Sequence, residues 1–280
     1  DLVDARPESA FPLVLLHMKL YDQYVGSRAL VPQAHTRRVI EALTELWLAR
    51  SKRPETRVRA AELLAHLGAT VQDVGLDASA ARLFKRSIDV DKGCPAGLVG
   101  MAAGLERSGA YRPAVRFLEQ LVDAHPDHAE GRLRLAVNLL RLGSSSKAEE
   151  LLGSCLTGDV PRWVRTVAYQ ELARVELGKG RLDAAGSLLV RAGQEGIEDE
   201  QISLLRAYLL DRQNRAREAY DAASKVTAAH SASEGSARLR YSQWPRDDQD
   251  AIRRRLDEAA PAAWETLREA VASARWEAGS

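Results

Sequence analysis

Residues 95–128 read PAGLVGMAAGLERSGAYRPAVRFLEQLVDAHPDH, and this stretch decides the fold. Apolar residues recur at helical spacing on both sides of Gly109, a residue type that readily takes the left-handed conformation at the end of a helix. Ala114 and Leu118 follow one helical turn apart, and Pro126 stands where a second helix must end. The stretch therefore predicts two antiparallel helices joined by a short turn.

The same pattern recurs along the chain. In four places a glycine is followed five residues later by an alanine, with spacings of 34, 34 and 37 residues between successive glycines. The four pairs are Gly75 with Ala80, Gly109 with Ala114, Gly143 with Ala148, and Gly180 with Ala185. Asn214 with Ala219 continues the series after another 34 residues, and Asn also tolerates the left-handed conformation. The chain is therefore expected to be built of repeated helix pairs.

Large apolar residues follow the same period. Four residues after the first four alanines stand Phe84, Leu118, Leu152 and Leu189. Two helices approach closely where one contacting side chain is small, and the large residue then fills the space between neighbouring pairs. A single pair cannot bury its own apolar faces, so several pairs are expected to stack into one continuous core.

This pattern resembles the tetratricopeptide repeat, a unit of two helices with a period of about 34 residues. The resemblance implies an all-α fold, an α-α superhelix or solenoid of stacked antiparallel helix pairs. Five such repeats are expected, at residues 61–94, 95–128, 129–162, 166–199 and 200–233. Residues 1–60 are expected to form a degenerate helical pair at the N-terminus, and residues 234–280 to form C-terminal capping helices, because terminal repeats need a polar outer face.

Local signals add three expectations. The spacing of 37 residues contains about one extra helical turn, and the segment Pro161–Trp163 predicts that the following helix is lengthened at its N-terminus. Ser146 and Glu149 have the spacing of a capping box at the start of a helix. A loop is expected around Pro32.

Charge and cysteine content exclude several classes of protein. The chain has 40 Lys and Arg residues against 39 Asp and Glu residues, whereas a nucleic-acid-binding protein usually carries a clear basic excess on one face. No segment is long and apolar enough to span a membrane. Cys94 and Cys155 lie in different repeats and are expected to be small packing residues, not disulfide partners or zinc ligands.

Known catalytic motifs are absent from the sequence. It contains no phosphate-binding loop, zinc-binding HExxH helix, nucleophile elbow or dinucleotide fingerprint. We therefore expect no enzyme, and no catalytic residue, metal or cofactor. Three other features have structural interpretations: close helix packing for Gly97, Gly100 and Gly104, an inter-helix turn for Gly178-Lys179-Gly180, and a solvated loop for His125 and His128.

The resemblance implies that the first helix of each pair lines a concave groove. The residues expected near this groove are Val99, Ala103, Leu133, Val137, Gln170, Arg174, Leu204 and Tyr208, with Arg107, Asn138 and Arg141 at its edge. One hypothesis is a peptide groove that combines apolar contacts with arginine forks for acidic side chains. The alternative is that some of these residues only pack between repeats. Some family members clamp a partner's terminal carboxylate with Lys, Asn and Arg, but here Val99 and Ala103 occupy the corresponding places.

The resemblance favours a scaffold or adaptor that binds another protein or peptide. One alternative is the repeat segment of a larger bacterial envelope assembly, such as one for polysaccharide export. Another is a carbohydrate-binding module using Trp163, Trp244, Trp264 or Trp276, and self-association through the C-terminal helix is a further possibility. Because the chain starts at Asp1 and not at Met, we expect a fragment or a processed product. The compartment stays open between cytoplasm and periplasm.

Overall fold

The structure is a computed structural model of the chain. The structure describes residues 14, 18, 30–50, 53–73, 75–196, 200–215, 218, 219 and 222. Within these residues the secondary structure consists of helices without strands, as the sequence predicts. The chain divides into two compact units, residues 1–128 and residues 129–280.

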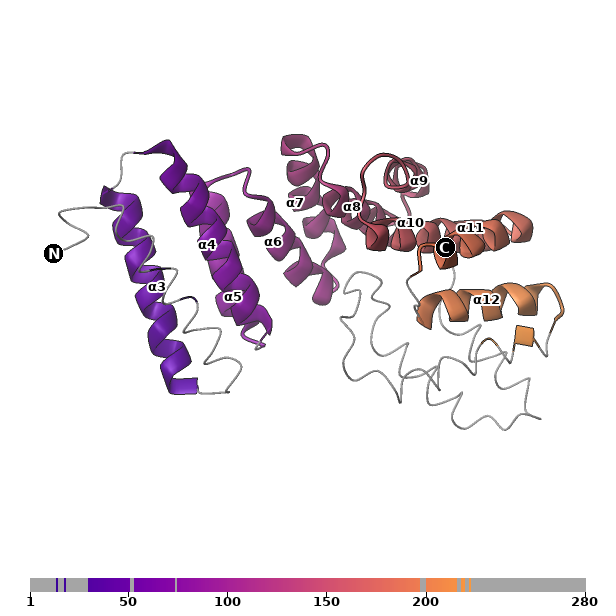
Figure 1. Cartoon of the computed structure of the whole chain (residues 1–280), viewed down its shortest axis with the longest axis horizontal. Helices are drawn as coiled ribbons and strands as arrows, with labels where there is room; N and C mark the ends of the chain where they lie inside the picture. The colour runs from indigo at the N-terminus through magenta and orange to yellow at the C-terminus, as the bar shows by residue number, and fades with distance from the viewer. Residues whose placement is uncertain are drawn as a thin grey trace. The chain divides into compact units, whose positions relative to one another are not determined.

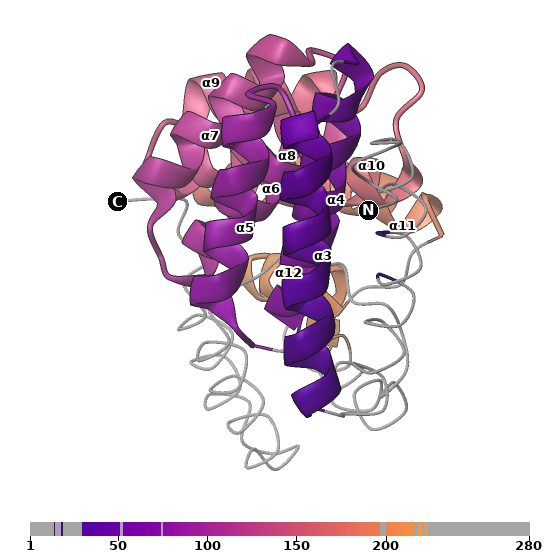
Figure 2. The same ribbon diagram turned by 90° about the vertical axis from the view of Figure 1, so that its left-hand side faces the viewer.

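Unit 1 contains five of the described helices (Figure 1). They are α3 (Leu30–Arg50), α4 (Pro54–Asp73), α5 (Asp77–Val90), α6 (Pro95–Arg107) and α7 (Tyr111–Ala124). Helices α4 and α5 pack together as one pair and α6 and α7 as the next, while α6 also contacts both α4 and α5. Figure 2 shows α3 at the near end of this stack, where it contacts α4.

Unit 2 repeats the arrangement in its described part. Its helices are α8 (Ala129–Arg141), α9 (Ser145–Ser154), α10 (Arg162–Gly178), α11 (Leu182–Gln194) and α12 (Glu200–Arg212). Helices α8 and α9 form one pair and α10 and α11 the next, and α12 packs against α11. The first helices of successive pairs also touch, α8 with α10 and α10 with α12. Each unit is thus a stack of antiparallel helix pairs.

The predicted turns have the predicted backbone conformation. Gly75, Gly109, Gly143 and Gly180 have φ values of 83°, 73°, 78° and 74°, and Asn214 has a φ of 59°. The N–H of the residue after each of them donates to a carbonyl five residues back in the preceding helix, for example Ala110 to Leu105. This bond closes the helix end in the manner of a Schellman motif. The recurring glycine is therefore a helix terminator.

Small and large residues meet as expected at the pair contacts. The five repeated alanines, Ala80, Ala114, Ala148, Ala185 and Ala219, are all 0% exposed. The four large residues Phe84, Leu118, Leu152 and Leu189 are buried as well. The residues that recur with the repeat period are thus the residues that form the core.

Phe84 occupies a slot that only glycine leaves open. A Cβ atom built on Gly100 of α6 would lie 2.2 Å from the Phe84 ring, and one on Gly68 of α4 would lie 2.8 Å from it. On Gly97 a Cβ would lie 2.7 Å from the Ser87 hydroxyl, which itself donates to the carbonyl of Ala61 at 2.7 Å. The prediction of close packing is confirmed for Gly97 and Gly100.

The long repeat spacing has two sources. Helix α10 has 17 residues against 13 in α8, which confirms the lengthened helix, and Pro161 is its N-cap residue. Helix α9 has only 10 residues, and the connection after it runs from residue 155 to 161, a feature the sequence did not indicate.

The expected capping box is wrong. Helix α9 begins at Ser145, so Ser146 already lies inside its first turn, and the N-cap residue Ser144 makes no side-chain cap bond. Glu149 instead accepts two hydrogen bonds at 2.7 Å from Lys179, the residue that directly follows α10.

The ends of the chain differ in how much is described. Val14 and Met18 are buried in the same cluster as Ile40 and Trp47 of α3. The loop expected around Pro32 is wrong, because Pro32 lies in the first turn of α3, where a missing N–H costs no helical bond. Helix α4 begins at Pro54, before the expected repeat start at residue 61. The expected caps at 234–280 and most of the second helix of the last repeat lie outside the described residues.

Candidate partner-binding face

The first helices of unit 2 carry residues that occupy equivalent places in successive repeats. Ten residues before each turn residue stand Leu133 of α8, Gln170 of α10 and Leu204 of α12. All three are buried, Gln170 completely, with 0% exposed. These three residues are here called the buried column. A groove residue must reach the surface, so the buried column supports the face from below.

One helical turn further along, the equivalent residues reach the surface. Six residues before each turn residue stand Val137, Arg174 and Tyr208, here called the accessible column. All three are partly exposed, the Arg174 side chain to only 11%. Because α10 contacts both α8 and α12, these residues come from three neighbouring helices. The accessible column therefore offers an aliphatic, a cationic and an aromatic side chain on one face.

Arg174 is held in place by its own helix. Its Nη1 donates to both carboxylate oxygens of Glu171, at 2.8 and 2.7 Å. The side chains of Arg174 and Glu171 are only 11% and 4% exposed. Ion pairs this deep cost desolvation and commonly serve geometric specificity more than stability. Glu171 was not predicted from the sequence, although its spacing of three residues from Arg174 is the spacing of a helical ion pair.

Tyr208 contacts a second arginine, Arg212. The Arg212 guanidinium lies over the Tyr208 ring, 5.9 Å from its centre, and Arg212 Nη1 donates to the Tyr208 hydroxyl at 3.2 Å. Tyr208 packs against the buried cluster of Leu205, Leu209 and their neighbours, which fixes the ring. Arg212 itself is exposed. Arg212 was not predicted from the sequence, although it follows Tyr208 by one helical turn.

The residues expected at the groove edge have different environments. Asn138 is buried, and its Nδ2 donates to the carbonyl of Arg134 at 2.8 Å. Arg141 is exposed at the end of α8. In unit 1, Arg107 is exposed and pairs with Asp77 of α5, so it closes the contact between α6 and α5.

Unit 1 has a first-helix face of smaller residues. Val99 and Ala103 of α6 are half-buried. On the neighbouring α4, Val58, Glu62 and His66 are exposed at successive helical turns, and none of them was predicted from the sequence. The described first-helix face of unit 1 thus presents aliphatic side chains, a carboxylate and an imidazole, whereas that of unit 2 presents an arginine and a tyrosine.

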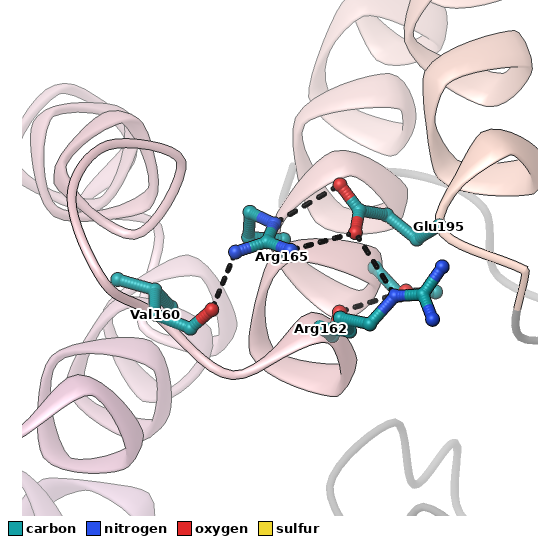
Figure 3. Close-up of polar contacts among 5 residues, drawn as sticks. Val160, Arg162, Arg165 and Glu195 are labelled. Atoms are coloured by element: carbon teal, nitrogen blue, oxygen red, sulfur yellow. Dashed lines mark hydrogen bonds and ion pairs between the residues drawn. The ribbon is translucent and has the colours of Figure 1, made fainter.

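A clasp holds the ends of α10 and α11 together (Figure 3). Arg165 of α10 donates from Nε and Nη2 to the two carboxylate oxygens of Glu195, each at 3.0 Å, and from Nη1 to the carbonyl of Val160. Arg162 adds a longer contact of 4.0 Å to Glu195. The hydrogen bonds from Arg165 lower the pKa of Glu195, and Glu195 in turn raises the pKa of Arg165. The clasp fixes the geometry of the pair that carries Arg174.

The basic turn Gly178-Lys179-Gly180 serves the fold. Lys179 Nζ contacts Glu149 at 2.7 Å and Glu176 at 3.8 Å, and Arg181 Nε contacts Glu176 at 2.6 Å. A surface hollow of about 570 Å³ lies beside this turn, lined by Gly180, Arg181, Leu182, Asp183, Ala184 and Gln213. The cations at this turn therefore bind carboxylates of the chain itself.

The described histidine, cysteine and tryptophan side chains that the sequence singled out differ in their contacts and burial. His125 Nε2 lies 2.7 Å from the carbonyl oxygen of Gly93, and Cys94 and Cys155 are buried thiols. Burial raises the pKa of Cys155. Trp163 is half-buried, while Trp244, Trp264 and Trp276 lie outside the described residues.

The described part of the chain contains no group of three or more His, Cys, Asp or Glu side chains arranged to hold a metal ion. None of its helices combines the length and the apolar character that crossing a membrane requires.

Comparison with known proteins identifies the repeat. A family model described as the tetratricopeptide repeat matches residues 105–155. No curated protein sequence matches the chain.

Solved structures share the fold at low sequence identity. A tetratricopeptide repeat protein from Parabacteroides merdae is 13% identical, with 92% of this chain and 98% of that chain covered and a TM-score of 0.57. PilW, a type IV pilus biogenesis factor, is 17% identical, with 79% and 96% covered and a TM-score of 0.55. PilF from Pseudomonas aeruginosa is 15% identical, with 84% and 98% covered and a TM-score of 0.51. At these identities the likeness concerns the fold alone.

Proposed function

We propose that this chain, which shares the fold of tetratricopeptide repeat proteins and matches the model of that repeat at residues 105–155, is a non-catalytic scaffold that binds a segment of a partner protein on the first-helix face of unit 2. The observation that carries the proposal is the accessible column, Val137, Arg174 and Tyr208. It joins three kinds of side chain, each supplied by a different helix of one packed stack.

The composition of this face suits protein recognition. Tyrosine and arginine are enriched among the residues that dominate binding energy at protein interfaces. The aliphatic residue Val137 supplies apolar contact area that does not require a particular orientation of the partner. A catalytic site would instead need a nucleophile or a base within hydrogen-bonding reach of a reacting group.

The face is also preorganised. Arg174 is held by Glu171, and Tyr208 is fixed against the core. Side chains that are already ordered lose little conformational entropy when a partner binds. A rigid stack of helices therefore provides an efficient platform for an extended or helical segment.

The proposal can be tested without knowing the natural partner. Peptides would be selected from a random display library with the full chain as bait, and their affinities measured by fluorescence anisotropy. Tyr208→Ala should weaken the selected peptides by roughly tenfold or more, as expected for an interface aromatic. Val137→Ser should weaken them by a smaller factor.

Val190 provides the matched control for Val137. It lies on the second helix α11 and is 56% exposed, so Val190→Ser removes the same groups from another face. Circular dichroism of each variant checks that the helices are retained. Equal affinities for the Val137→Ser, Tyr208→Ala and unmodified chains would overturn the proposal, as would a selection that yields no binding peptide.

A further inference from the structure

We propose that the partner segment recognised by this face is acidic, with an Asp or Glu side chain that binds Arg212. This inference rests on the proposed function and adds the chemistry of the partner. It follows from the balance of charges on the three first helices of unit 2 and from the way Tyr208 holds Arg212.

Taken together, these three helices have eight arginines and five acidic residues. Helix α8 has three arginines and one acidic residue, α10 has three and two, and α12 has two and two. The chain as a whole is nearly neutral, with a formal net charge of +1. The basic excess is therefore concentrated on the helices that carry the accessible column.

The carboxylates on α8 and α10 are already bound within the chain. Glu130 accepts a hydrogen bond from Arg134 at 3.0 Å, and Glu171 binds Arg174. Glu176 contacts both Lys179 and Arg181. On α12, Asp211 stands next to Arg212 and has a polar partner of its own. Because Arg134 and Arg174 are neutralised by these carboxylates, the net positive charge of the three helices lies on their other arginines.

Arg212 is the arginine best prepared to take an external carboxylate. Arg134, Arg174 and Arg165 bind Glu side chains, whereas the described contacts of Arg212 are the ring and the hydroxyl of Tyr208. A guanidinium has five N–H donors, and Arg212 uses one of them here. The ring limits the orientations of the guanidinium, so a carboxylate would meet a partly ordered cation.

The position of Arg212 predicts where the acidic residue lies in the partner segment. Arg212 lies one turn beyond Tyr208 at the C-terminal end of α12, where the helix dipole adds negative potential that favours a cation. Val137 lies on α8, on the other side of α10 in the order of helix contacts. A segment that spans the accessible column would thus place an apolar residue at α8 and an acidic residue at α12.

The test uses three sets of short synthetic peptides with the same apolar residues. One set carries Asp and Glu at the variable polar positions, the second Asn and Gln, and the third Lys and Arg. Their affinities for the full chain are measured by fluorescence anisotropy at low and high salt. The unmodified chain should prefer the acidic set, and this preference should weaken as salt screens the charges.

Arg212→Gln should reduce affinity for the acidic set roughly three- to tenfold and leave affinity for the amide set unchanged. Arg191→Gln is the matched control, because Arg191 is an exposed arginine on the second helix α11. Tyr208→Phe keeps the ring and removes the hydroxyl, so it should retain much of the acidic preference.

The possible results separate the two proposals. Peptide binding without acidic preference, or an acidic preference that Arg191→Gln lowers as much as Arg212→Gln does, would overturn the inference and leave the scaffold function standing. If none of the three sets nor any library peptide binds, both proposals fail.

Discussion

The contact between Phe84 and Gly100 shows how one residue selects another across the stack. Leucine stands at the equivalent places 118, 152 and 189, so the larger ring at position 84 needs extra room. Gly100 and Gly68 supply that room, because any Cβ there would meet the ring. A glycine inside a helix costs about 1 kcal/mol relative to alanine, and this packing explains why the cost is tolerated at Gly100.

Gly100→Ala should lower the free energy of unfolding by about 2 kcal/mol, because overpacking outweighs the better helix propensity. In a Phe84→Leu background the same substitution should be neutral or stabilising, since the shorter side chain vacates the slot. Urea denaturation of the four proteins of this double-mutant cycle measures the coupling. A cost of Gly100→Ala that is the same in both backgrounds would show that the ring is not the cause.

At Glu195 we predict a pH dependence. Its pKa is lowered in the folded chain by Arg165, so the carboxylate contributes stability above the pKa of the unfolded chain and loses it as pH falls through the folded pKa. Glu195→Gln should therefore melt at a lower temperature than the unmodified chain at neutral pH. The difference should shrink as pH falls through and below the ordinary range of a glutamate, about 4.3. A difference between the two melting temperatures that stays constant from neutral to acidic pH would contradict the role given to the clasp.

Single residues also show what could be predicted. The turn glycines, Asn214 and the buried alanines were all identified from their spacing, because a helix end and a close helix contact each demand one residue type. The clasp between Arg165 and Glu195 was not identified. These residues are 30 positions apart, and nothing local links their side chains before the two helices pack.

At the scale of the element, α9 departs most from the repeat. It has 10 residues, whereas α5 and α7 have 14 each. The spacing of 37 residues predicted a longer α10 and said nothing of α9, since a turn lost from one helix and residues gained by a connection compensate in the total. Element lengths within a repeat depend on where the caps form, and the cap expected at Ser146 was wrong.

Helix α9 offers a stabilising substitution. Gly153 lies inside α9, and a Cβ atom built on it would find no neighbour within 4 Å. Gly153→Ala should therefore raise the free energy of unfolding by about 0.5–1 kcal/mol, through helix propensity alone. Urea denaturation checks the value. A loss of stability would mean that this glycine has a packing role the structure does not show.

At the scale of the whole molecule, the all-α fold of stacked pairs followed from the sequence because the same physical contact recurs at a fixed period. The groove residues could be predicted only in part from the sequence. Spacing placed Leu133, Val137, Gln170 and Arg174 on the first helices, but it could not tell the buried column from the accessible one. Whether a residue is buried or accessible depends on how each helix is rotated about its own axis relative to its neighbours. That rotation is determined by the packing between helices and cannot be inferred from the spacing alone.

The two units present different first-helix faces, and the functional account depends on one of them. Val99 and Ala103 of unit 1 are small or aliphatic, while unit 2 combines an aliphatic residue, a fixed arginine and an aromatic residue at the accessible column. The central claim is that a partner segment lies along α8, α10 and α12.

Amide chemical shifts of the isotopically labelled chain, recorded with and without a selected peptide, test this claim most directly. The account predicts that the largest shift changes fall around Val137, Arg174, Tyr208 and Arg212, with little change around Val190 and Arg191 on α11. Changes centred on α11, or on helices of unit 1, would contradict it.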